Sequence, residues 1–454
     1  MRASNSQTGV ATLLAISHLA QAAHLHQVVE YPVKRVAGSS ENAVSVSINN
    51  EQWLYTVEIS IGTPPQKTLV QVDTGSAYLW VNANCTAAPT EFGAQELCKT
   101  VPLYDPEDSS SAEGPNGTRT LGYGSGGVVN GAIVDIYEDV VRVGNATVKT
   151  QKFGVASNSR GLPIGIMGLA PPFNGTFDEN EPYSLLLDSM AVDSVIASRA
   201  YGISVGTASD SEGSLIFGGL DRGKFSGSLK KTPIFKSRDG GTRLTINLSS
   251  VGADAGNSTK KQYSIKDTNV QLDTGHTSTR LSKDLAEQIH SDLGAELNEE
   301  LGVYLVDCKV RDHAGGITFG FGGGDAEKII TVPFHELIYT SQGLCAVALE
   351  PTEEGEQQIL GDSFLRAAYV VFDWDNKNVH IAQAANCGSD IVGITSGPNS
   401  VPSVTGKCSS NSTATGSSPT ATGQVSSAGQ LQIGQAQLMG LSATVLLGLI
   451  LTMV

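Results

Sequence analysis

The chain has 454 residues, a formal net charge of −16 at pH 7 and an isoelectric point near 4.9. This acidic balance, with no basic stripe along the sequence, excludes nucleic acid as a partner and suits a protein that works in acid, where protonation of carboxylates relieves their repulsion. Without its two terminal segments, about 340 residues remain, which is enough for two lobes with separate cores.

The amino-terminal segment has the pattern of a secretory signal peptide. Within residues 1–22, a basic Arg2 precedes an apolar stretch, and Ala20-Gln21-Ala22 matches a cleavage site. Lys34-Arg35 is typical of a dibasic processing site, so we expect a short propeptide over residues 23–35. The alternative is an exposed basic pair that is never cut.

Two strand patterns each end in an Asp-Thr-Gly turn. Residues 68–72 alternate before Asp73-Thr74-Gly75-Ser76, and residues 268–272 alternate before Asp273-Thr274-Gly275-His276-Thr277. Glycine after each Asp permits a sharp turn, and its amide can hydrogen-bond the carboxylate. An ordinary turn is the alternative, but both copies follow an alternating strand. Each half of the chain is therefore predicted to deliver one Asp to a shared site.

Two adjacent carboxyls have a specific chemistry. Because both cannot ionise at low energetic cost, they share a proton, and their apparent pKa values lie on either side of an acidic working pH. The ionised group can then accept a proton from water while the protonated group polarises a substrate carbonyl. The pair predicts hydrolysis of an amide bond by general acid and base, without a metal or a covalent intermediate.

A glycine-rich segment lies between the two turns and surrounds Tyr123. Residues 122–127 satisfy the pattern GxGxxG of dinucleotide-binding proteins, but residues 128–137 have a strand pattern where a helix would be required. Helical patterns are few, and the clearest cover residues 184–197 and 282–297. The fold class is therefore predicted to be all-β.

The carboxyl-terminal segment changes composition twice. Residues 395–429 are rich in Ser, Thr, Gly and Pro, which predicts a glycosylated stalk without a core. Residues 438–454 are largely apolar, with no basic residue after them. This order matches a GPI-anchor signal over residues 430–454, which is removed when Ser427 or a neighbour receives the lipid. A transmembrane helix is the alternative, although the apolar run is short.

These motifs resemble the pepsin-like aspartic proteases. Residues 55–81 (YTVEISIGTPPQKTLVQVDTGSAYLWV) are similar to the start of the family's first lobe, and the resemblance continues to residue 385. Further landmarks are Tyr123-Gly124-Ser125-Gly126, Ile166-Met167-Gly168-Leu169, GSLIFGG at 213–219, and Ile359-Leu360-Gly361-Asp362-Ser363-Phe364. The resemblance implies a bilobal all-β fold, with catalytic lobes over residues 50–222 and 223–388 and a cleft between them for an extended peptide.

The resemblance also implies roles for the site residues. Asp73 and Asp273 are the catalytic pair, and Thr74 and Thr274 are an interlocked pair that fixes their spacing. Tyr123 is expected on a flap that closes over the substrate, with Trp80 as its indole partner. The other expected substrate-binding positions are Gly75, Ser76, Gly124, Ser125, Gly275 and Thr277. The alternatives are a surface aromatic for Tyr123, a core residue for Trp80 and strand-forming threonines for the pair.

Six cysteines and seven glycosylation motifs agree with an exported chain. The resemblance supports the disulfides Cys85–Cys98 and Cys308–Cys345, each within one lobe. Cys387 and Cys408 remain, so their pairing follows only by elimination. The Asn-x-Ser/Thr motifs begin at Asn84, Asn116, Asn145, Asn174, Asn247, Asn257 and Asn411.

Position 276 departs from the family pattern, in which Ser or Thr follows the second Asp-Thr-Gly. We hypothesise that His276, protonated in acid, lies near the two carboxyls and lowers their apparent pKa. In the alternative, the imidazole turns away and Thr277 supplies the supporting hydroxyl.

The order of signal, stalk and anchor is similar to that of the surface-anchored fungal yapsins. We therefore expect a monomeric enzyme on the plasma membrane or cell wall, acting on extended peptides or proteins with hydrophobic or basic side chains. No cofactor or metal is expected, because Tyr339 breaks the HExxH pattern that begins at His335. An inactive binding protein of the same fold is the alternative function, and a wall adhesin would leave the two Asp-Thr-Gly turns unexplained.

Overall fold

The computed structural model describes residues 43–50, 54–89, 94–124, 130–172, 184–238, 240–241, 243–256, 260–324 and 327–409. The signal peptide, the propeptide, the GPI signal with Ser427 and the stalk beyond residue 409 lie outside the described residues. No helix in the described ranges is long and apolar enough to cross a membrane.

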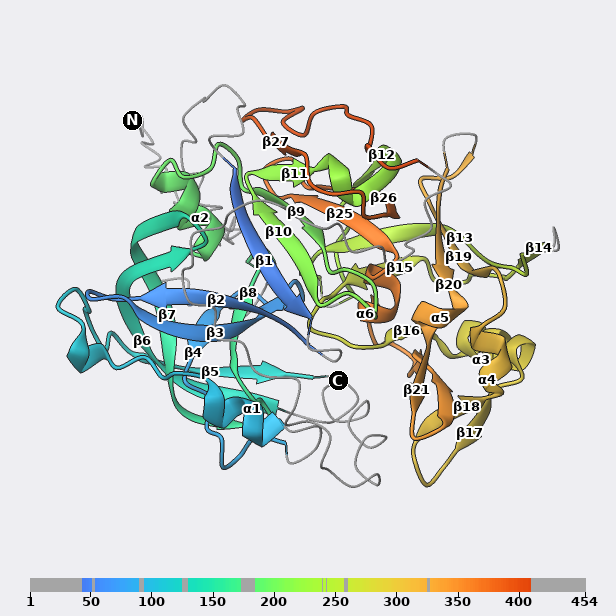
Figure 1. The fold of residues 1–454 in the computed structure, drawn as a ribbon, viewed down its shortest axis with the longest axis horizontal. Coiled ribbons are helices and arrows are strands. Elements are labelled where there is room, and N and C mark those ends of the chain that lie inside the picture. Colours follow the sequence, from blue (N-terminus) through green and yellow to red (C-terminus); the bar gives the residue numbers. More distant parts are fainter. Residues whose placement is uncertain are drawn as a thin grey trace, which may run out of the picture. The chain divides into compact units, whose positions relative to one another are not determined.

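Strands dominate the described chain, as expected for an all-β fold (Figure 1). The largest sheet has 13 strands and draws on both halves of the sequence. In spatial order they are β12 (Phe225–Pro233), β26 (Asn378–Ala384), β25 (Ala368–Asp373), β9 (Ala200–Ser204), β10 (Glu212–Phe217), β1 (Val44–Asn50), β2 (Tyr55–Ile61), β3 (Gln66–Asp73), β8 (Gly165–Gly168), β4 (Leu79–Val81), β7 (Ala146–Arg160), β6 (Asn130–Val143) and β5 (Thr118–Tyr123).

The second half of the chain builds three smaller sheets. An eight-stranded sheet contains β20 (Lys328–Pro333), β19 (Gly316–Phe321), β13 (Thr245–Asp254), β15 (Asn269–Leu272), β24 (Gln358–Leu360), β16 (Thr279–Ser282), β23 (Leu349–Thr352) and, beside β13, β14 (Lys260–Gln262). A four-stranded sheet contains β17 (Glu296–Asn298), β18 (Val303–Val306), β22 (Leu344–Val347) and β21 (Ile338–Ser341). The strands β11 (Gly219–Asp221) and β27 (Ile391–Gly393) form a two-stranded sheet.

The helices are short. They are α1 (Ala94–Thr100), α2 (Leu186–Val192), α3 (Lys283–Leu293), α4 (Cys308–Arg311), α5 (Phe334–Leu337) and α6 (Asp362–Leu365), with 3₁₀ turns at Pro106–Asp108 and Arg222–Lys224. Both predicted helices form, but each is shorter than its apolar pattern. Helix α3 ends because Gly294 adopts a left-handed conformation, with φ of 66°, and its amide closes the last turn.

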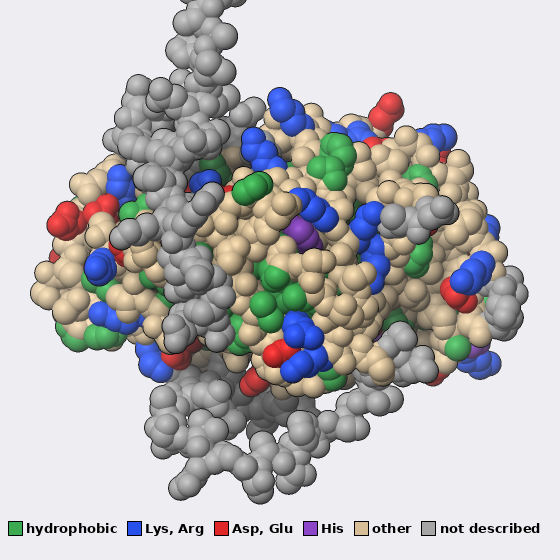
Figure 2. Space-filling model, turned by 90° about the horizontal axis from the view of Figure 1, so that it is seen from above, with side chains coloured by type: hydrophobic (Ala, Val, Ile, Leu, Met, Phe, Trp, Pro, Cys, Tyr) green, Lys and Arg blue, Asp and Glu red, His purple; other side chains and the backbone are tan. Residues whose placement is uncertain are grey.

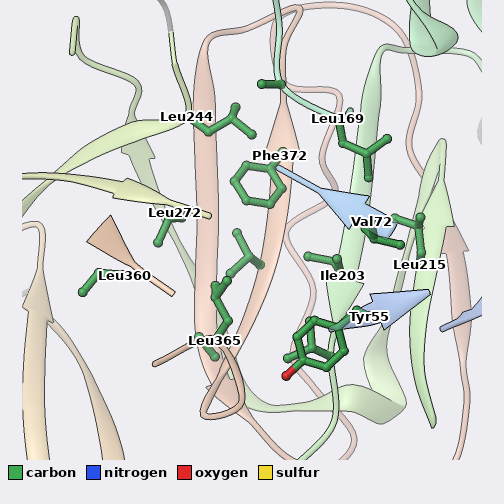
Figure 3. Close-up of a cluster of buried hydrophobic side chains, with 14 of the residues drawn as sticks. Tyr55, Val72, Leu169, Ile203, Leu215, Leu244, Leu272, Leu360, Leu365 and Phe372 are labelled. Carbon is green, nitrogen blue, oxygen red and sulfur yellow. The ribbon is translucent and has the colours of Figure 1, made fainter. Parts of the chain in front are cut away.

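The hydrophobic core continues from one half of the chain to the other. Val72 and Leu169 belong to the same buried cluster as Leu244, Leu272 and Leu360 (Figure 3). Burying these side chains together stabilises the folded chain, since apolar burial contributes about 25 cal/mol per Å². The two strands that lead to the Asp-Thr-Gly turns are therefore fixed in one continuous core.

The folded body extends beyond the expected lobe limits at both ends. At the amino-terminal end β1 starts at Val44, whereas the first lobe was expected from residue 50. Residues 395–409, expected to begin the stalk, instead pack against the body. Ser400 is 2% exposed, and its hydroxyl donates to Asp373 Oδ2 at 3.1 Å. The stalk prediction was wrong over residues 395–409, because the Cys387–Cys408 disulfide and the buried Ser400 tie this Ser- and Gly-rich segment to the body.

All three disulfides are present in the structure. Cys85 is bonded to Cys98, Cys308 to Cys345 and Cys387 to Cys408. The two pairs supported by the resemblance are confirmed, and so is the less certain third pair.

Candidate active site

Each half of the chain delivers its Asp in the same way. Strand β3 ends at Asp73 and pairs in parallel with β8, so that Val72 lies opposite Met167. Strand β15 ends one residue before Asp273 and pairs in parallel with β24, so that Leu272 lies opposite Leu360. The family landmarks Ile166-Met167-Gly168 and Ile359-Leu360-Gly361 thus lie at the parallel partners of the two Asp-bearing strands.

Thr74 and Thr274 connect the two turns. The Thr74 amide donates to Thr274 Oγ1 at 3.0 Å, and the Thr274 amide donates to Thr74 Oγ1 at 3.0 Å. Each hydroxyl donates in turn to the opposite strand, Thr74 to the Leu272 carbonyl at 3.0 Å and Thr274 to the Val72 carbonyl at 2.9 Å. Four hydrogen bonds between buried groups fix the spacing of the two Asp residues.

The two carboxyls meet where the turns approach one another. The carboxyls of Asp73 and Asp273 share a hydrogen bond. Each also accepts from the amide of its own glycine, Gly75 N–H at 2.7 Å and Gly275 N–H at 2.8 Å. A Cβ added at Gly75 would collide with the carboxyl of Asp273, so only glycine permits this approach.

The surroundings of the two carboxyls are unequal. Burial raises the pKa of Asp73, but hydrogen bonds from the Ser76 hydroxyl and the Gly75 amide oppose that rise by favouring the ionised form. Burial and the adjacent Asp73 charge raise the pKa of Asp273. The hydrogen bonds to Asp73 thus favour its ionised form, while the adjacent Asp73 charge favours the protonated form of Asp273.

A chain of polar groups leads from the flap to the first carboxyl. The Trp80 indole donates to Tyr123 Oη at 2.8 Å, and the Tyr123 hydroxyl also hydrogen-bonds Ser76, whose own hydroxyl donates to Asp73. Tyr123 lies at the end of β5, which pairs antiparallel with β6 as a hairpin, in agreement with the expected flap. The structure thus brings Tyr123 and Trp80 to the dyad, and Gly124 follows with a φ of 103°. Ser125 lies outside the described residues.

The hypothesis for His276 was wrong. Its imidazole is 5% exposed, and Nδ1 lies 2.9 Å from the Ser278 carbonyl, to which a neutral ring donates. Burial and the nearby Arg280 charge lower the pKa of His276 to about 3, so the ring stays neutral at moderately acidic pH. A buried imidazole without an acidic partner does not hold the positive charge that the hypothesis from the sequence required.

The alternative interpretation of this turn had two parts, and only the part about the His276 imidazole agrees with the structure. The His276 imidazole does turn toward Ser278, but Thr277 does not supply a hydroxyl to Asp273. Among the described residues, the hydrogen bond of Thr277 is made by its carbonyl, which accepts from the Ser363 amide at 3.2 Å. Within the described part of the chain, no hydroxyl supports Asp273 as Ser76 supports Asp73.

Two residues that the motifs did not reveal approach Asp273. Gln271 Nε2 donates to Asp273 Oδ2 at 3.3 Å. Arg243, just before β13, lies 3.5 Å from the Gly75 carbonyl through Nη1, and its charge lowers the pKa of Asp273. Gln271 could have been found from its place two residues before Asp273, whereas Arg243 has no such signal in the sequence.

The glycosylation motifs fall into three groups. Asn116 and Asn145 are exposed, while Asn84 and Asn247 are half-buried. The Asn84 amide oxygen also accepts from the Thr86 hydroxyl of its own motif at 2.8 Å. Asn174, Asn257 and Asn411 lie outside the described residues.

Comparisons with known proteins agree with this geometry. The model of the family described as eukaryotic aspartyl protease matches residues 54–384. Secreted aspartic protease 5 of Candida albicans is 31% identical over 379 residues, which cover 80% of this chain and 85% of that protein. A probable aspartic-type endopeptidase of Aspergillus fumigatus is 29% identical over 431 residues, covering 89% and 86% respectively. The solved aspartic proteinase of Irpex lacteus shares the fold, with a TM-score of 0.60 at 21% identity, over 75% of this chain and 97% of that one.

Proposed function

The chain belongs to the eukaryotic aspartyl protease family, and from this premise we propose that it is an endopeptidase that hydrolyses peptide bonds at acidic pH. The observation that carries the proposal is the hydrogen-bonded pair of carboxyls, one from each half of the chain, whose pKa values are raised by burial. A buried carboxyl pair with one proton is suited to general acid–base catalysis.

Each carboxyl has a defined part in the reaction. Asp73, ionised and supported by Ser76 and Gly75, accepts a proton from a water molecule as that water attacks the scissile carbonyl carbon. Asp273 donates its proton to the carbonyl oxygen, so that no full negative charge develops there. In the second step Asp73 gives the proton that it took from water to the amide nitrogen, and Asp273 takes a proton back from a hydroxyl of the tetrahedral intermediate as the carbon–nitrogen bond breaks, so the pair returns to its initial state.

The surroundings of the dyad favour an extended peptide as substrate. The two carboxyls lie where the two halves meet, and the hairpin bearing Tyr123 reaches the same site. Closure of such a hairpin excludes water from the reaction and orders the substrate. Substrates of several residues, with a broad preference for hydrophobic or basic side chains, fit this arrangement.

The location we propose is the cell surface, reached by secretion. The signal-peptide pattern supports it, as do three disulfides, which are typical of exported proteins, and relatives named as secreted proteases. The stalk after residue 409 and a GPI anchor at Ser427 would hold the enzyme on the membrane or wall. An inactive binding protein is not favoured, since both Asp residues and the flap tyrosine are in place.

The activity can be tested with a peptide library and a statine-type transition-state analogue. Cleavage in the acidic range that the analogue blocks is the expected result, and cleavage that resists the analogue would contradict the mechanism. The anchor is tested separately by treating intact cells with a phospholipase C that cuts GPI lipids. Release of the enzyme is expected, and retention would contradict GPI anchoring without affecting the catalytic proposal.

A further inference from the structure

The two catalytic carboxyls receive hydrogen bonds in the same pattern but from different places in the chain. Oδ1 of each accepts from the amide of the glycine two residues later, at 2.7 Å for Asp73 and 2.8 Å for Asp273. Oδ2 of Asp73 accepts from the Ser76 hydroxyl, which follows the turn. Oδ2 of Asp273 accepts from Nε2 of Gln271, which precedes the turn, at 3.3 Å. Each carboxyl thus has a glycine amide on one oxygen and a side-chain donor on the other.

The residue that corresponds to Ser76 in the second turn gives Asp273 no donor. His276 stands at that position, and its Nδ1 is engaged with the Ser278 carbonyl at 2.9 Å. Its Nε2 is buried and has no hydrogen-bond partner among the described residues. A side-chain donor for Asp273 therefore has to come from outside the turn.

Strand β15 brings Gln271 to the face that carries Asp273. Consecutive residues of an extended chain point to opposite faces, so Gln271 and Asp273 share one face while Val270 and Leu272 point into the core. The strand is paired on both sides, with β13 and with β24. The Gln271 side chain is 3% exposed, so the surrounding protein holds its amide beside the carboxyl.

Asp273 depends on such donors because water reaches it poorly. The face drawn in Figure 2 shows Asp and Glu side chains on the outer surface, where water solvates them. Asp273, in contrast, is half-buried where the two turns meet. Removing a carboxylate from water is unfavourable unless hydrogen bonds replace the lost solvation, and donors to its oxygens favour the ionised form.

We propose that Gln271 is a positioning residue whose amide holds the Asp273 carboxyl in place, as the Ser76 hydroxyl does for Asp73. Donors on both oxygens restrict rotation of the carboxyl about its bond to Cβ. The proton that Asp273 gives to the substrate carbonyl is thereby kept in line with its acceptor, and such alignment contributes to the rate. This catalytic consequence rests on the proposed function.

The first half of the chain contains a matched glutamine without this contact. Gln71 precedes Asp73 by two residues and lies opposite Ile166 of β8, as Gln271 lies opposite Ile359 of β24. It is also largely buried, with 9% of its surface exposed. In the part of the chain that the structure describes, its amide makes no hydrogen bond to Asp73. Substitution of Gln71 therefore controls for the loss of a buried amide beside a catalytic strand.

The test compares Gln271→Met with Gln71→Met, since each removes an amide and keeps an unbranched side chain. The titration of Asp273 is followed by NMR of protein isotopically labelled at the Asp carboxyl carbons, and its signal is assigned by its loss in Asp273→Asn. This measurement does not depend on peptide cleavage. Gln271→Ala is the second form if Gln271→Met does not fold. The double variant Gln271→Met/His276→Ser places a hydroxyl at the position that corresponds to Ser76.

Loss of the Gln271 amide should raise the pH at which Asp273 titrates by roughly 0.4–1 unit, because a neutral hydrogen bond that favours the ionised form is removed. The value of kcat, measured in parallel, should fall roughly two- to tenfold. Gln71→Met should leave the titration of Asp273 in place, and the double variant should return it toward that of the parent.

An unmoved titration in Gln271→Met, an equal shift in Gln71→Met, or no return in the double variant would overturn the proposal. A failure of the proposed function has a different signature. In that case the parent protein would cleave no peptide at any pH, while the shift in the titration of Asp273 would still show that Gln271 supports this carboxyl.

Discussion

Replacing Thr274 with valine should loosen the connection between the two catalytic turns. The substitution keeps the shape of the side chain but removes a hydroxyl that donates to the Val72 carbonyl and accepts from the Thr74 amide. Each buried polar group left without a partner costs about 1–3 kcal/mol, and the substitution leaves two such groups, so the loss in unfolding free energy should be about 2–6 kcal/mol. The dyad would also shift, and a displacement near 1 Å can lower kcat about a hundredfold.

Thr245 offers a matched control in the same half of the chain. It is also fully buried, but its hydroxyl has no hydrogen-bond partner among the described residues. Thr245→Val should therefore leave the unfolding free energy unchanged or slightly increased. Denaturant unfolding and kcat are measured for both variants. Equal effects of the two substitutions would refute the role of Thr274 as an interlock, because loss of a hydroxyl alone would then account for the result.

Three further substitutions test the electrostatics of the site. Ser76→Ala removes a hydrogen bond that lowers the pKa of Asp73, so the acidic limb of kcat/KM should move to higher pH; an unmoved limb would exclude this role. Arg243→Met removes a charge that lowers the pKa of Asp273, so the alkaline limb of kcat/KM should move to higher pH. Arg243→Lys keeps the charge and should leave the alkaline limb in place. A move of the limb to lower pH in Arg243→Met would contradict the claim that Arg243 lowers the pKa of Asp273. His276, with a pKa of about 3 when folded and about 6.5 when unfolded, loses stability as pH falls from 6.5 toward 3. Between pH 7 and pH 4, the unfolding free energy of His276→Thr, measured in urea, should therefore fall by about 3 kcal/mol less than that of the parent. The acidic limb of kcat/KM should not move. An unchanged pH dependence of the unfolding free energy would argue against a buried neutral ring.

The catalytic turns could be predicted from the sequence because their determinants are local. Alternation along residues 268–272 specifies a strand, and the Gly after each Asp specifies the turn. The family landmarks at residues 166–168 and 359–361 lie in the parallel partner strands, but their pairing with the Asp-bearing strands is shown only by the structure. The pairing of Thr74 with Thr274 followed from the family resemblance, and the structure shows the four hydrogen bonds that it requires.

Other features depend on tertiary contacts that no local pattern encodes. Whether His276 is charged depends on its burial and on Arg280, and a motif reveals neither. Arg243 reaches the dyad only because β13 pairs with β15. Residues 395–409 have the composition of a stalk, yet the disulfide to Cys408 and the burial of Ser400 make them part of the body.

The most direct test of the account is the pH profile of peptide hydrolysis by Asp73→Asn and Asp273→Asn beside the parent enzyme. Each substitution removes one of the two groups that must exchange protons with water and substrate. We predict that kcat falls at least about a thousandfold in both variants. Control measurements of folding and of binding to the statine-type analogue should show that both variants are folded. Near-normal hydrolysis by either variant would contradict the claim that these two carboxyls act as a pair.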